Sequence, residues 1–204
     1  MPSQGIFDGM MPNQTRAQAA RRKILNATYA LLGERAPAEI DMAAIAGRAG
    51  MTAVEIHRHF AGSMEIFRAL AEQAMETVDG PLEDMLLSGA SLQWLTEHAV
   101  GLLIANNTVA DRRLLELVRS SQDLVDIWTL SRARVVGALT VAVQARNPRL
   151  PEPVRQAAVL VLAQAMISGA DAILSCEDGE QRLFMQRELV AMGVAYLEKL
   201  MVRT

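Results

Sequence analysis

Residues 45–60 of the chain are IAGRAGMTAVEIHRHF, a stretch that contains the signals for two short helices joined by a tight turn. Gly50 stands where the end of a helix commonly needs a left-handed backbone. Thr52 and Glu55 have the spacing of a capping box, in which each side chain accepts a hydrogen bond from the other residue's backbone amide. A second helix is therefore expected from Thr52 to about His59, and the stretch predicts a helix-turn-helix.

Apolar residues on both sides of this turn repeat at helical spacing. Ile45, Ala46, Ala49 and Ile56 can meet in a small core, and the two alanines allow the helix axes to approach closely. The outer face of the second helix is then free to enter the major groove of DNA.

The rest of the sequence has helical periodicity and few turn signals. Asp41 is expected to cap the first helix of the motif, and Ser63 to cap a longer helix that Asp79-Gly80-Pro81 breaks or kinks. No stretch alternates as a strand does between hairpin turns. We therefore predict an all-α protein, with helices over residues 15–34, 42–49, 52–59, 63–78, 82–87, 91–106, 111–119, 122–146, 151–175 and 180–202.

The composition fits one folded core, or a small domain leading into a larger one: the chain has 204 residues, of which 51% are hydrophobic and 21% charged. The single cysteine, Cys176, excludes an intrachain disulfide and a zinc site built on paired thiolates, and it fits a reducing compartment. The first dozen residues lack the basic start and apolar run of a signal peptide. A cytoplasmic protein is expected.

The apolar stretch over residues 157–176 is the nearest approach to a membrane span. Gln164 and Asp171 interrupt it, and a charge at the centre of a membrane helix costs about 2.5–3.5 kcal/mol. We interpret the stretch as a buried helix of a soluble protein, and no membrane partner is expected.

The formal net charge of −3 is unevenly distributed. Residues 13–60 contain seven basic and four acidic side chains, a balance of +3 that leaves −6 for the rest of the chain. Because the positive part coincides with the predicted helix-turn-helix, contact with DNA is expected at that end.

Residues 21–67 resemble, in order and without gaps, the DNA-binding domain of the TetR family of bacterial transcriptional regulators. Ala36 stands where a glycine is common in the family. Three further positions depart from the family pattern, where Val54 replaces a small residue, His57 a tyrosine and Ser63 a lysine. The segments that carry the resemblance are ILNAT at 24–28 with Leu31, IAGRAGMT at 45–52, IHRHF at 56–60, and Ile66-Phe67.

This resemblance implies a tail over residues 1–14, a DNA-binding domain over 15–62, and a ligand-binding and dimerisation domain over 63–204. It implies duplex DNA with a palindromic operator, a small-molecule effector and a second copy of the chain as partners, with no cofactor and no metal. Two recognition helices about 34–36 Å apart would reach successive major grooves. An effector that binds a wider separation better would release the DNA.

Charge and position select the residues expected at the DNA. Glu55 belongs either to the capping box or to base reading, where it would accept from a cytosine amino group. His57 and His59 are interpreted as facing DNA or solvent rather than as a metal pair. Thr52 and the amides of its helix can hold a phosphate, and the arginines neutralise others. The expected DNA-binding residues are Arg16, Arg21, Arg22, Arg48, Thr52, Ala53, His57, Arg58, His59 and Ser63.

Small and apolar residues form stripes on the last two long helices. These stripes can pair with their symmetry mates in a four-helix interface, fill the subunit's own core, or do both, which is the interpretation we favour. The expected interface residues are Ala158, Val161, Ala165, Gly169, Ala172, Leu189, Met192, Gly193 and Tyr196.

A pocket for the effector is expected among bulky side chains between residues 64 and 166. The alternative is that these side chains are ordinary core, and His98 is the residue to test first, because a polar ring in an apolar stripe needs a partner. Methionines adapt to irregular ligands, so a mostly apolar effector is expected. The expected lining residues are Trp94, His98, Leu102 and Asn106 on one helix face, with Met75, Met85, Trp128 and Met166 around them.

Two other functions compete with a regulator. Against an enzyme, the sequence lacks a G-x-S-x-G motif, a glycine-rich phosphate loop and a metal-spaced His/Glu set, and Cys176 lies beside two acidic residues, an unsuitable setting for a nucleophile. A dimeric ligand-binding protein on the same fold, with weakened DNA contacts, is suggested by His57, Ser63 and the low charge.

Overall fold

The computed structural model describes residues 16–105 and 108–203, and every regular element within them is helical. The all-α prediction is confirmed, whereas the expected tail over 1–14 and Asn106 lie outside the described residues. In chain order the elements are α1 (Arg16–Glu34), the 3-10 helix η1 (Pro37–Glu39), α2 (Met42–Ala49), α3 (Ala53–His57), α4 (Ser63–Leu87), α5 (Leu92–Ala105), α6 (Val109–Ser120), α7 (Val125–Arg146), α8 (Glu152–Ser175) and α9 (Gly179–Met201).

Helix α4 is longer than predicted. It continues through Pro81, so the break expected at Asp79-Gly80-Pro81 was wrong. A proline removes one amide donor from a helix, and here the missing bond is the one to the carbonyl of Thr77. Leu82 and Leu86 beyond it are buried, and their packing stabilises the last turns of the helix despite the lost hydrogen bond.

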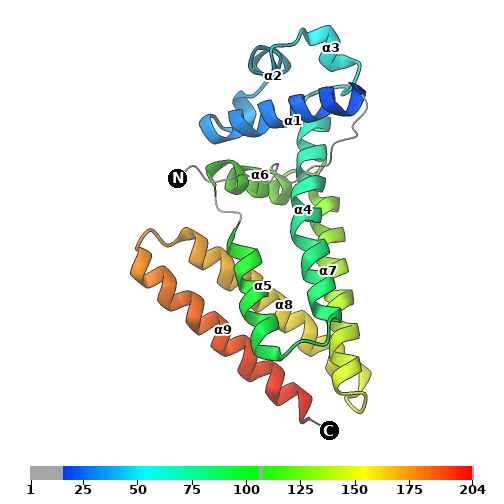
Figure 1. The fold of residues 1–204 in the computed structure, drawn as a ribbon, viewed down its shortest axis with the longest axis vertical. Helices are drawn as coiled ribbons and strands as arrows, with labels where there is room; N and C mark the ends of the chain where they lie inside the picture. The colour runs from blue at the N-terminus through cyan, green and yellow to red at the C-terminus, as the bar shows by residue number, and fades with distance from the viewer. Residues whose placement is uncertain (1–15, 106–107, 204) are drawn as a thin grey trace. The chain divides into compact units, whose positions relative to one another are not determined.

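The chain forms two compact units, which are described separately. The first contains Met1–Thr77 and Asn107–Thr129, and it brings α1, α2, α3 and α6 together with the first part of α4 and the start of α7. Figure 1 shows α2 and α3 beside α1. Its core side chains come from every one of these helices; among the most buried are Ile24, Leu32, Ile45, Ile56, Phe60, Ile66, Val118 and Leu124.

Helix α6 packs on α1 in this first unit. The Tyr29 hydroxyl donates a hydrogen bond of 2.7 Å to Asp111, and burial raises the pKa of Tyr29 to about 12. Arg113 donates to the carbonyl of Leu32 at 2.8 Å. A capping box of Thr108 and Asp111 begins α6. The predicted boundary at residue 62 between a DNA-binding and a ligand-binding domain remains a proposal. The compact first unit also includes α6, which follows that boundary in the sequence.

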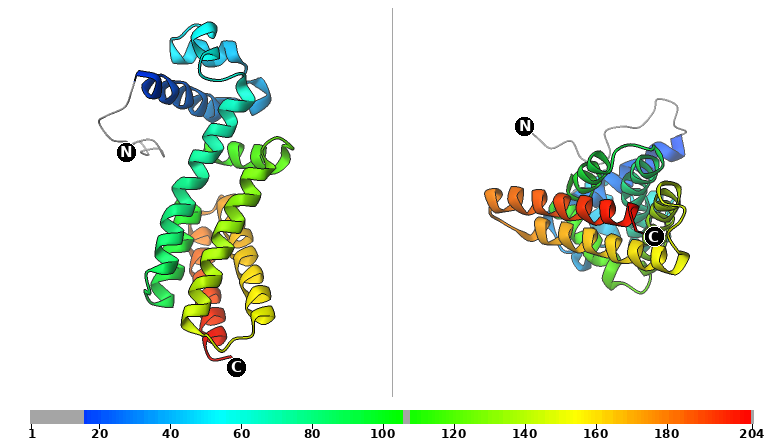
Figure 2. Two further views of the ribbon diagram at one scale, coloured as in Figure 1. Left: turned by 90° about the vertical axis from the view of Figure 1, so that its right-hand side faces the viewer. Right: turned by 90° about the horizontal axis from the view of Figure 1, so that it is seen from below.

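The second unit contains Val78–Asn106 and Leu130–Thr204. Figures 1 and 2 show α8 and α9 as an antiparallel pair, and α5 packs against both of them. At the end of this unit the Asn147 side chain donates to the carbonyls of Leu200 and Arg203, at 3.0 and 2.8 Å, and so ties the end of α7 to the end of α9.

Helix α8 is the one element in the described residues that is long and apolar enough to cross a membrane by length and composition alone. It packs against α5 and α9 within the chain, with Val159, Leu162 and Ile173 buried. A helix of a soluble protein's core passes the same test, so this one helix is weak evidence for a membrane span.

Candidate functional site

The turn between α2 and α3 has the backbone that its sequence predicts. The Asp41 side chain caps α2 by accepting from the amide of Ala44 at 2.7 Å. Gly50 ends the helix with φ of 57°, in the left-handed region that glycine adopts without a Cβ clash. Residues on either side of the turn, Ala46, Ala49 and Ile56 among them, are buried together with Ile45, which confirms the small core expected between the two helices.

Glu55 belongs to a capping box that fixes the start of α3. Its carboxylate accepts hydrogen bonds from the Thr52 amide at 2.7 Å and the Thr52 hydroxyl at 2.8 Å, while the Thr52 hydroxyl oxygen accepts from the Glu55 amide. The hydrogen bond from the Thr52 backbone, above all, holds the pKa of Glu55 below its usual value. The capping interpretation of Glu55 is therefore confirmed, and its carboxylate is engaged within the protein.

The outer face of α3 is exposed. Ala53, Val54, His57 and Arg58 are all accessible, and 66% of the Val54 side chain is exposed. His59 is half-buried. The face that a groove-binding helix would present is thus a short strip of small, apolar and weakly polar side chains with one arginine beside it.

Two arginines that were expected at the DNA make contacts inside the unit instead. Arg21 donates to the carbonyl of His59 at 2.7 Å, and its guanidinium lies over the ring of Phe60 with 4.1 Å to the ring centroid. Arg48 forms an ion pair with Glu34, which raises the pKa of Arg48 and lowers that of Glu34. Their role as DNA contacts remains a proposal. Arg16, Arg22 and Arg58 are exposed, as is Arg48 despite its ion pair, whereas Arg21 is half-buried.

Ser63 was expected to cap α4, but the structure makes it the first residue of the helix. Glu65 accepts from the amide of Ala61, so the acidic side chain in the first turn satisfies a donor that precedes the helix. Ser63 is half-buried.

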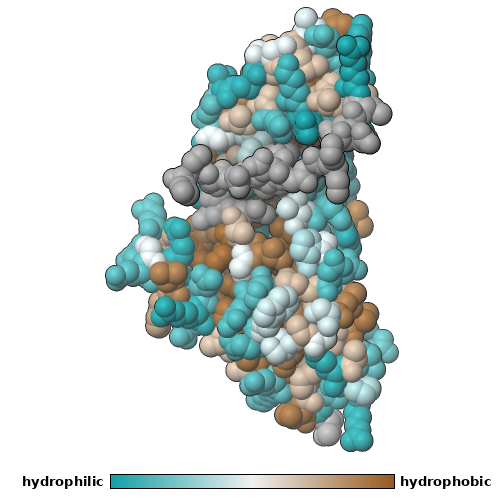
Figure 3. Space-filling model, viewed as in Figure 1, coloured by the Kyte–Doolittle hydropathy of each residue, from teal (hydrophilic) through white to brown (hydrophobic). Residues whose placement is uncertain are grey.

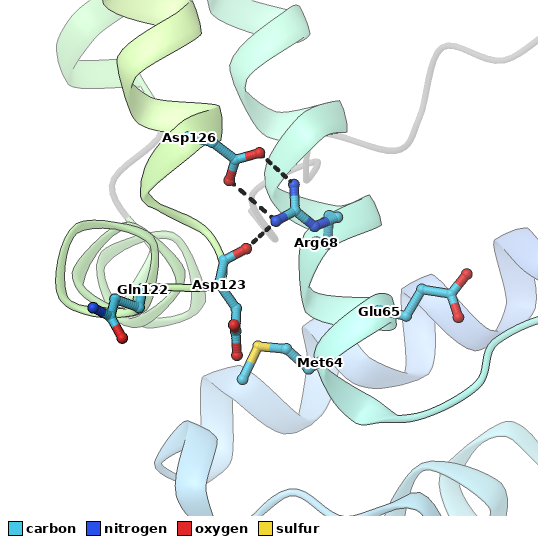
Figure 4. A pocket seen from close by; sticks show the side chains of 6 residues that line it. All are labelled: Met64, Glu65, Arg68, Gln122, Asp123 and Asp126. Atoms are coloured by element: carbon cyan, nitrogen blue, oxygen red, sulfur yellow. Dashed lines mark hydrogen bonds and ion pairs between the residues drawn. The ribbon is translucent and has the colours of Figure 1, made fainter.

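A surface pocket of the first unit lies where α4 meets the start of α7 (Figure 4). Arg68 crosses it, donating to both carboxylate oxygens of Asp126 at 2.8 and 3.1 Å and to the backbone carbonyl of Asp123. Figure 4 shows Glu65 directed away from this contact. Most of its lining side chains are charged or polar, and its central feature is an internal ion pair that fastens the two helices.

The residues expected to bind an effector are divided between the two units. Met75 and Trp128 pack in the core of the first unit, with the Arg119 guanidinium 4.4 Å from the Trp128 ring centroid. Met85, Leu102 and Met166 pack in the second unit, and Asn106 lies outside the described residues.

Trp94 and His98 lie on the surface of the second unit instead of lining a core. Their rings stack with 4.0 Å between centroids, and the His98 Nδ1 atom is 2.8 Å from the Trp94 carbonyl oxygen. Because His98 is exposed, its ring does not need a buried polar partner. Trp94 and His98 are both exposed members of the helix face that the sequence predicted to line a pocket.

A small apolar cluster that sequence reasoning missed lies between α5, α8 and α9. Its buried members are Val100, Ile173 and Leu189, and half-buried side chains, including two methionines, surround them. Figure 3 shows hydrophobic surface gathered over α5 and α8 in this part of the second unit. The half-buried side chains are Ile104, Met166, Met185 and Val190.

Of the residues expected at a dimer interface, several are used inside the second unit. Ala158, Leu189 and Gly193 are buried, and a Cβ at Gly193 would lie 2.7 Å from the Thr96 methyl carbon. A Cβ at Gly169 would lie 2.5 Å from a Leu189 methyl carbon. The two glycines allow α9 to approach α5 and α8 closely, so these residues serve the core of the second unit, and their use at a dimer interface as well remains a proposal.

The remaining expected interface residues differ in exposure. Val161, Ala172 and Met192 are exposed, whereas Ala165 and Tyr196 are half-buried. Leu183, which belongs to the predicted stripe of the last helix, is exposed as well. Two exposed apolar side chains on the same two helices were missed: Leu160 and Phe184, of which Phe184 is 62% exposed.

Residues 24–70 match the sequence model of the TetR family of bacterial regulatory proteins. The N-terminal domain is a TetR-family helix-turn-helix. The match begins in α1, includes the turn at Gly50 and ends in the first part of α4, so it covers the motif whose geometry is described above.

Solved structures extend the likeness beyond this TetR-family domain. A chain described as a TetR-family transcriptional regulator from Mesorhizobium loti has a TM-score of 0.73 at 18% identity, covering 91% of this chain and 98% of its own. Salmonella enterica GusR has a TM-score of 0.69 at 15% identity, and the match covers 92% of this chain and 100% of GusR. SmeT, the repressor of the Stenotrophomonas maltophilia multidrug efflux pump SmeDEF, has a TM-score of 0.68 at 19% identity, and the match covers 88% of this chain and 90% of SmeT. SmeT has also been solved as a triclosan complex. At these identities the likeness shows the fold; no curated protein sequence matches the chain.

The three departures from the TetR-family pattern have different settings in the structure. Val54 and His57 lie on the exposed face of α3, whereas Ser63 is partly covered at the start of α4. The departures therefore change the chemistry of the surface and leave the buried core of the TetR-family domain intact.

Proposed function

We propose that the protein is a ligand-responsive bacterial transcriptional regulator of the cytoplasm, a repressor that binds a palindromic operator as a dimer. The observation that carries the proposal is the outward face of α3. A capping box fixes the start of this helix, Ile56 anchors it in the core, and its other side is open to solvent. A helix held in this way can enter a major groove with its side chains toward the base edges.

Exposed arginines near the motif support phosphate contact. Arg22 on α1 and Arg58 at the end of α3 carry charge that neutralises phosphates, which is the dominant part of affinity for DNA. Thr52, at the start of α3, is exposed as well.

The exposed apolar side chains of α8 and α9 support pairing with a second copy. Val161, Leu160, Phe184 and Met192 present apolar groups to solvent on two neighbouring helices. A large exposed apolar surface of this kind marks an interaction site, and a two-fold dimer is the commonest closed assembly.

The apolar cluster between α5, α8 and α9 supports a small, mostly apolar effector. Met166 and Met185 are half-buried there, and their thioether chains can adapt to a ligand. The SmeT–triclosan complex supports a small-molecule effector on this fold. An effector that binds better to the conformation unable to hold DNA shifts the population by its difference in affinity for the two states.

A salt titration of DNA binding tests the proposal. Fluorescence anisotropy with a labelled duplex should give a steep loss of affinity with rising salt. Arg58→Ala should weaken binding to all sequences alike and reduce the slope of log binding constant against log salt concentration by about 1. Arg187→Ala, an exposed arginine of α9, is the matched control and should leave the slope unchanged. Affinity for DNA that does not respond to salt contradicts the proposal.

A thermal-shift screen tests the effector. A ligand present at 100 times its Kd adds about 2.7 kcal/mol of stability, and Met185→Ala should weaken that gain while the response to an unrelated destabilising agent stays constant. A binder found in this screen should also lower the affinity for DNA. Binders that leave DNA affinity unchanged contradict effector control.

A second function, ligand binding on the same fold without DNA binding, is favoured by one observation. Arg21 and Arg48, two of the expected DNA contacts, are engaged by His59 and Glu34 within the unit. If no duplex DNA is bound even at low salt while ligands and a dimer are found, this second function holds.

A further inference from the structure

We infer that Val54 recognises a thymine methyl group in each half of the operator. This inference rests on the proposed function, because it names the base-edge chemistry that the same helix would read. It assigns sequence specificity to a residue that the family pattern does not mark for it.

Val54 is an apolar side chain held outside the core on the second residue of α3. It is 66% exposed, while Ile56 two positions later is fully buried. The helix therefore has a solvent-exposed face and a buried face, and Val54 lies on the exposed one. In a five-residue helix whose start is fixed by a capping box, the direction of this side chain is set by the backbone. Two methyl groups are therefore presented where a base edge would come.

Val54 is the largest apolar side chain on the exposed face of α3, where contacts to base edges are expected. Ala53 has only one methyl group, and the Glu55 carboxylate is engaged by the Thr52 amide and hydroxyl. Both of these bonds end on Oε2 of Glu55, so the capping box holds this carboxylate at the helix start and competes with any contact to a cytosine amino group. His57 and Arg58 follow as the polar side chains of the exposed strip.

The major groove has one apolar group at its base edges, the C5 methyl of thymine. Contact between this methyl and Val54 removes apolar surface of both partners from water, which is favourable and which no other unmodified base can reproduce. Uracil has the same hydrogen-bonding edge as thymine and lacks only the methyl group. A thymine-to-uracil exchange therefore isolates the contact from every hydrogen bond in the interface.

The experiment uses the full-length chain and the operator that it selects from random DNA. Each thymine is replaced by deoxyuridine, symmetrically in both half-sites, and binding is measured for the unaltered chain, Val54→Ala and Val109→Ala. At one thymine position the unaltered chain should lose about fourfold in affinity per half-site, the effect of about one buried methyl group, and about 16-fold for the palindrome.

The variants separate a contact from a general weakening. Val54→Ala should bind the thymine operator more weakly and lose most of the discrimination between thymine and uracil. Val109→Ala changes another exposed valine of the first unit, 42% accessible on α6, and should keep the full discrimination. Because Val54 is exposed, both variants should keep the helical circular dichroism of the original chain.

Two results overturn the inference while the proposed function stands: specific binding with no thymine position sensitive to loss of the methyl group, or undiminished discrimination in Val54→Ala. Failure to bind any preferred sequence overturns the proposed function and the inference with it.

Discussion

The Arg21 guanidinium of α1 donates a 2.7 Å hydrogen bond to the carbonyl oxygen of His59, just beyond the C-terminal end of α3, and also lies over the Phe60 ring. A charge that the sequence suggested for DNA phosphate is therefore used to hold the recognition helix. Its contacts satisfy a carbonyl at a helix end, where no intrahelical donor is available. Arg21 therefore ties the end of α3 to α1, in addition to the packing of Ile56 in their shared core.

Arg21→Ala should destabilise the protein by about 2 kcal/mol, because it removes a charge-assisted hydrogen bond and a cation–π contact. Arg22→Ala, its exposed neighbour, should change stability by no more than about 0.5 kcal/mol. Urea unfolding followed by circular dichroism measures both. Equal stabilities for the two variants would show that the contact contributes nothing to the fold.

The Glu55 capping box should make the stability of the protein depend on acid. The pKa of Glu55 is lowered from 4.5 in the folded state, so its carboxylate stabilises the fold above that pH, and the contribution disappears as the pH falls through the lowered value. Glu55→Gln should lose less stability on acidification than the unaltered chain. Thermal unfolding of both proteins at a series of pH values from 6 downward gives the comparison. If both lose stability equally as the pH falls, the capping box does not contribute to the acid dependence.

Gly193→Ala should destabilise the second unit by about 1–3 kcal/mol, the range expected when a methyl group is forced into a packed core. The new Cβ would lie 2.7 Å from a Thr96 carbon and 3.2 Å from the Met166 sulfur. Gly137→Ala is the matched control on α7, since nothing lies within 4 Å of its Cβ position. This control should stabilise the protein by about 0.5–1 kcal/mol through helix propensity. The opposite order of the two variants in thermal unfolding contradicts the close crossing of α5 and α9.

Charge placed on the exposed face of α8 and α9 should dissociate the proposed dimer. Val161→Glu and Phe184→Glu bury an unpaired carboxylate if these positions are covered by a second copy, and the penalty for such burial is large. Val141→Glu alters an equally exposed valine of α7 and should leave the dimer intact. Sedimentation at micromolar concentration distinguishes monomer from dimer. A dimer that survives both substitutions would place its interface elsewhere.

The helix-turn-helix was predictable because its signals are local. Asp41, Gly50, Thr52 and Glu55 act on backbone atoms within a few residues of themselves, so the sequence spacing alone describes their contacts. The exposure of Val54 also follows from this spacing, once Ile56 is assigned to the core.

The second unit was less predictable because helical periodicity shows which residues share a face and not what that face contacts. Periodicity did not show that the rings of Trp94 and His98 stack at the surface, nor which contacts Leu189 and Gly193 make within the chain. The pocket and the dimer interface expected from these residues stay predictions. The continuation of α4 through Pro81 likewise depends on tertiary packing that outweighs a local signal.

Selection of DNA from a random duplex library by the full-length chain, at low salt, tests the central claim most directly. The account predicts enrichment of a palindrome whose half-sites are separated by about one helical turn, 10–10.5 base pairs, and selection of the same palindrome, at lower affinity, by Arg58→Ala. Recovery of a library with no preferred sequence, from a chain that is folded and dimeric, would contradict it.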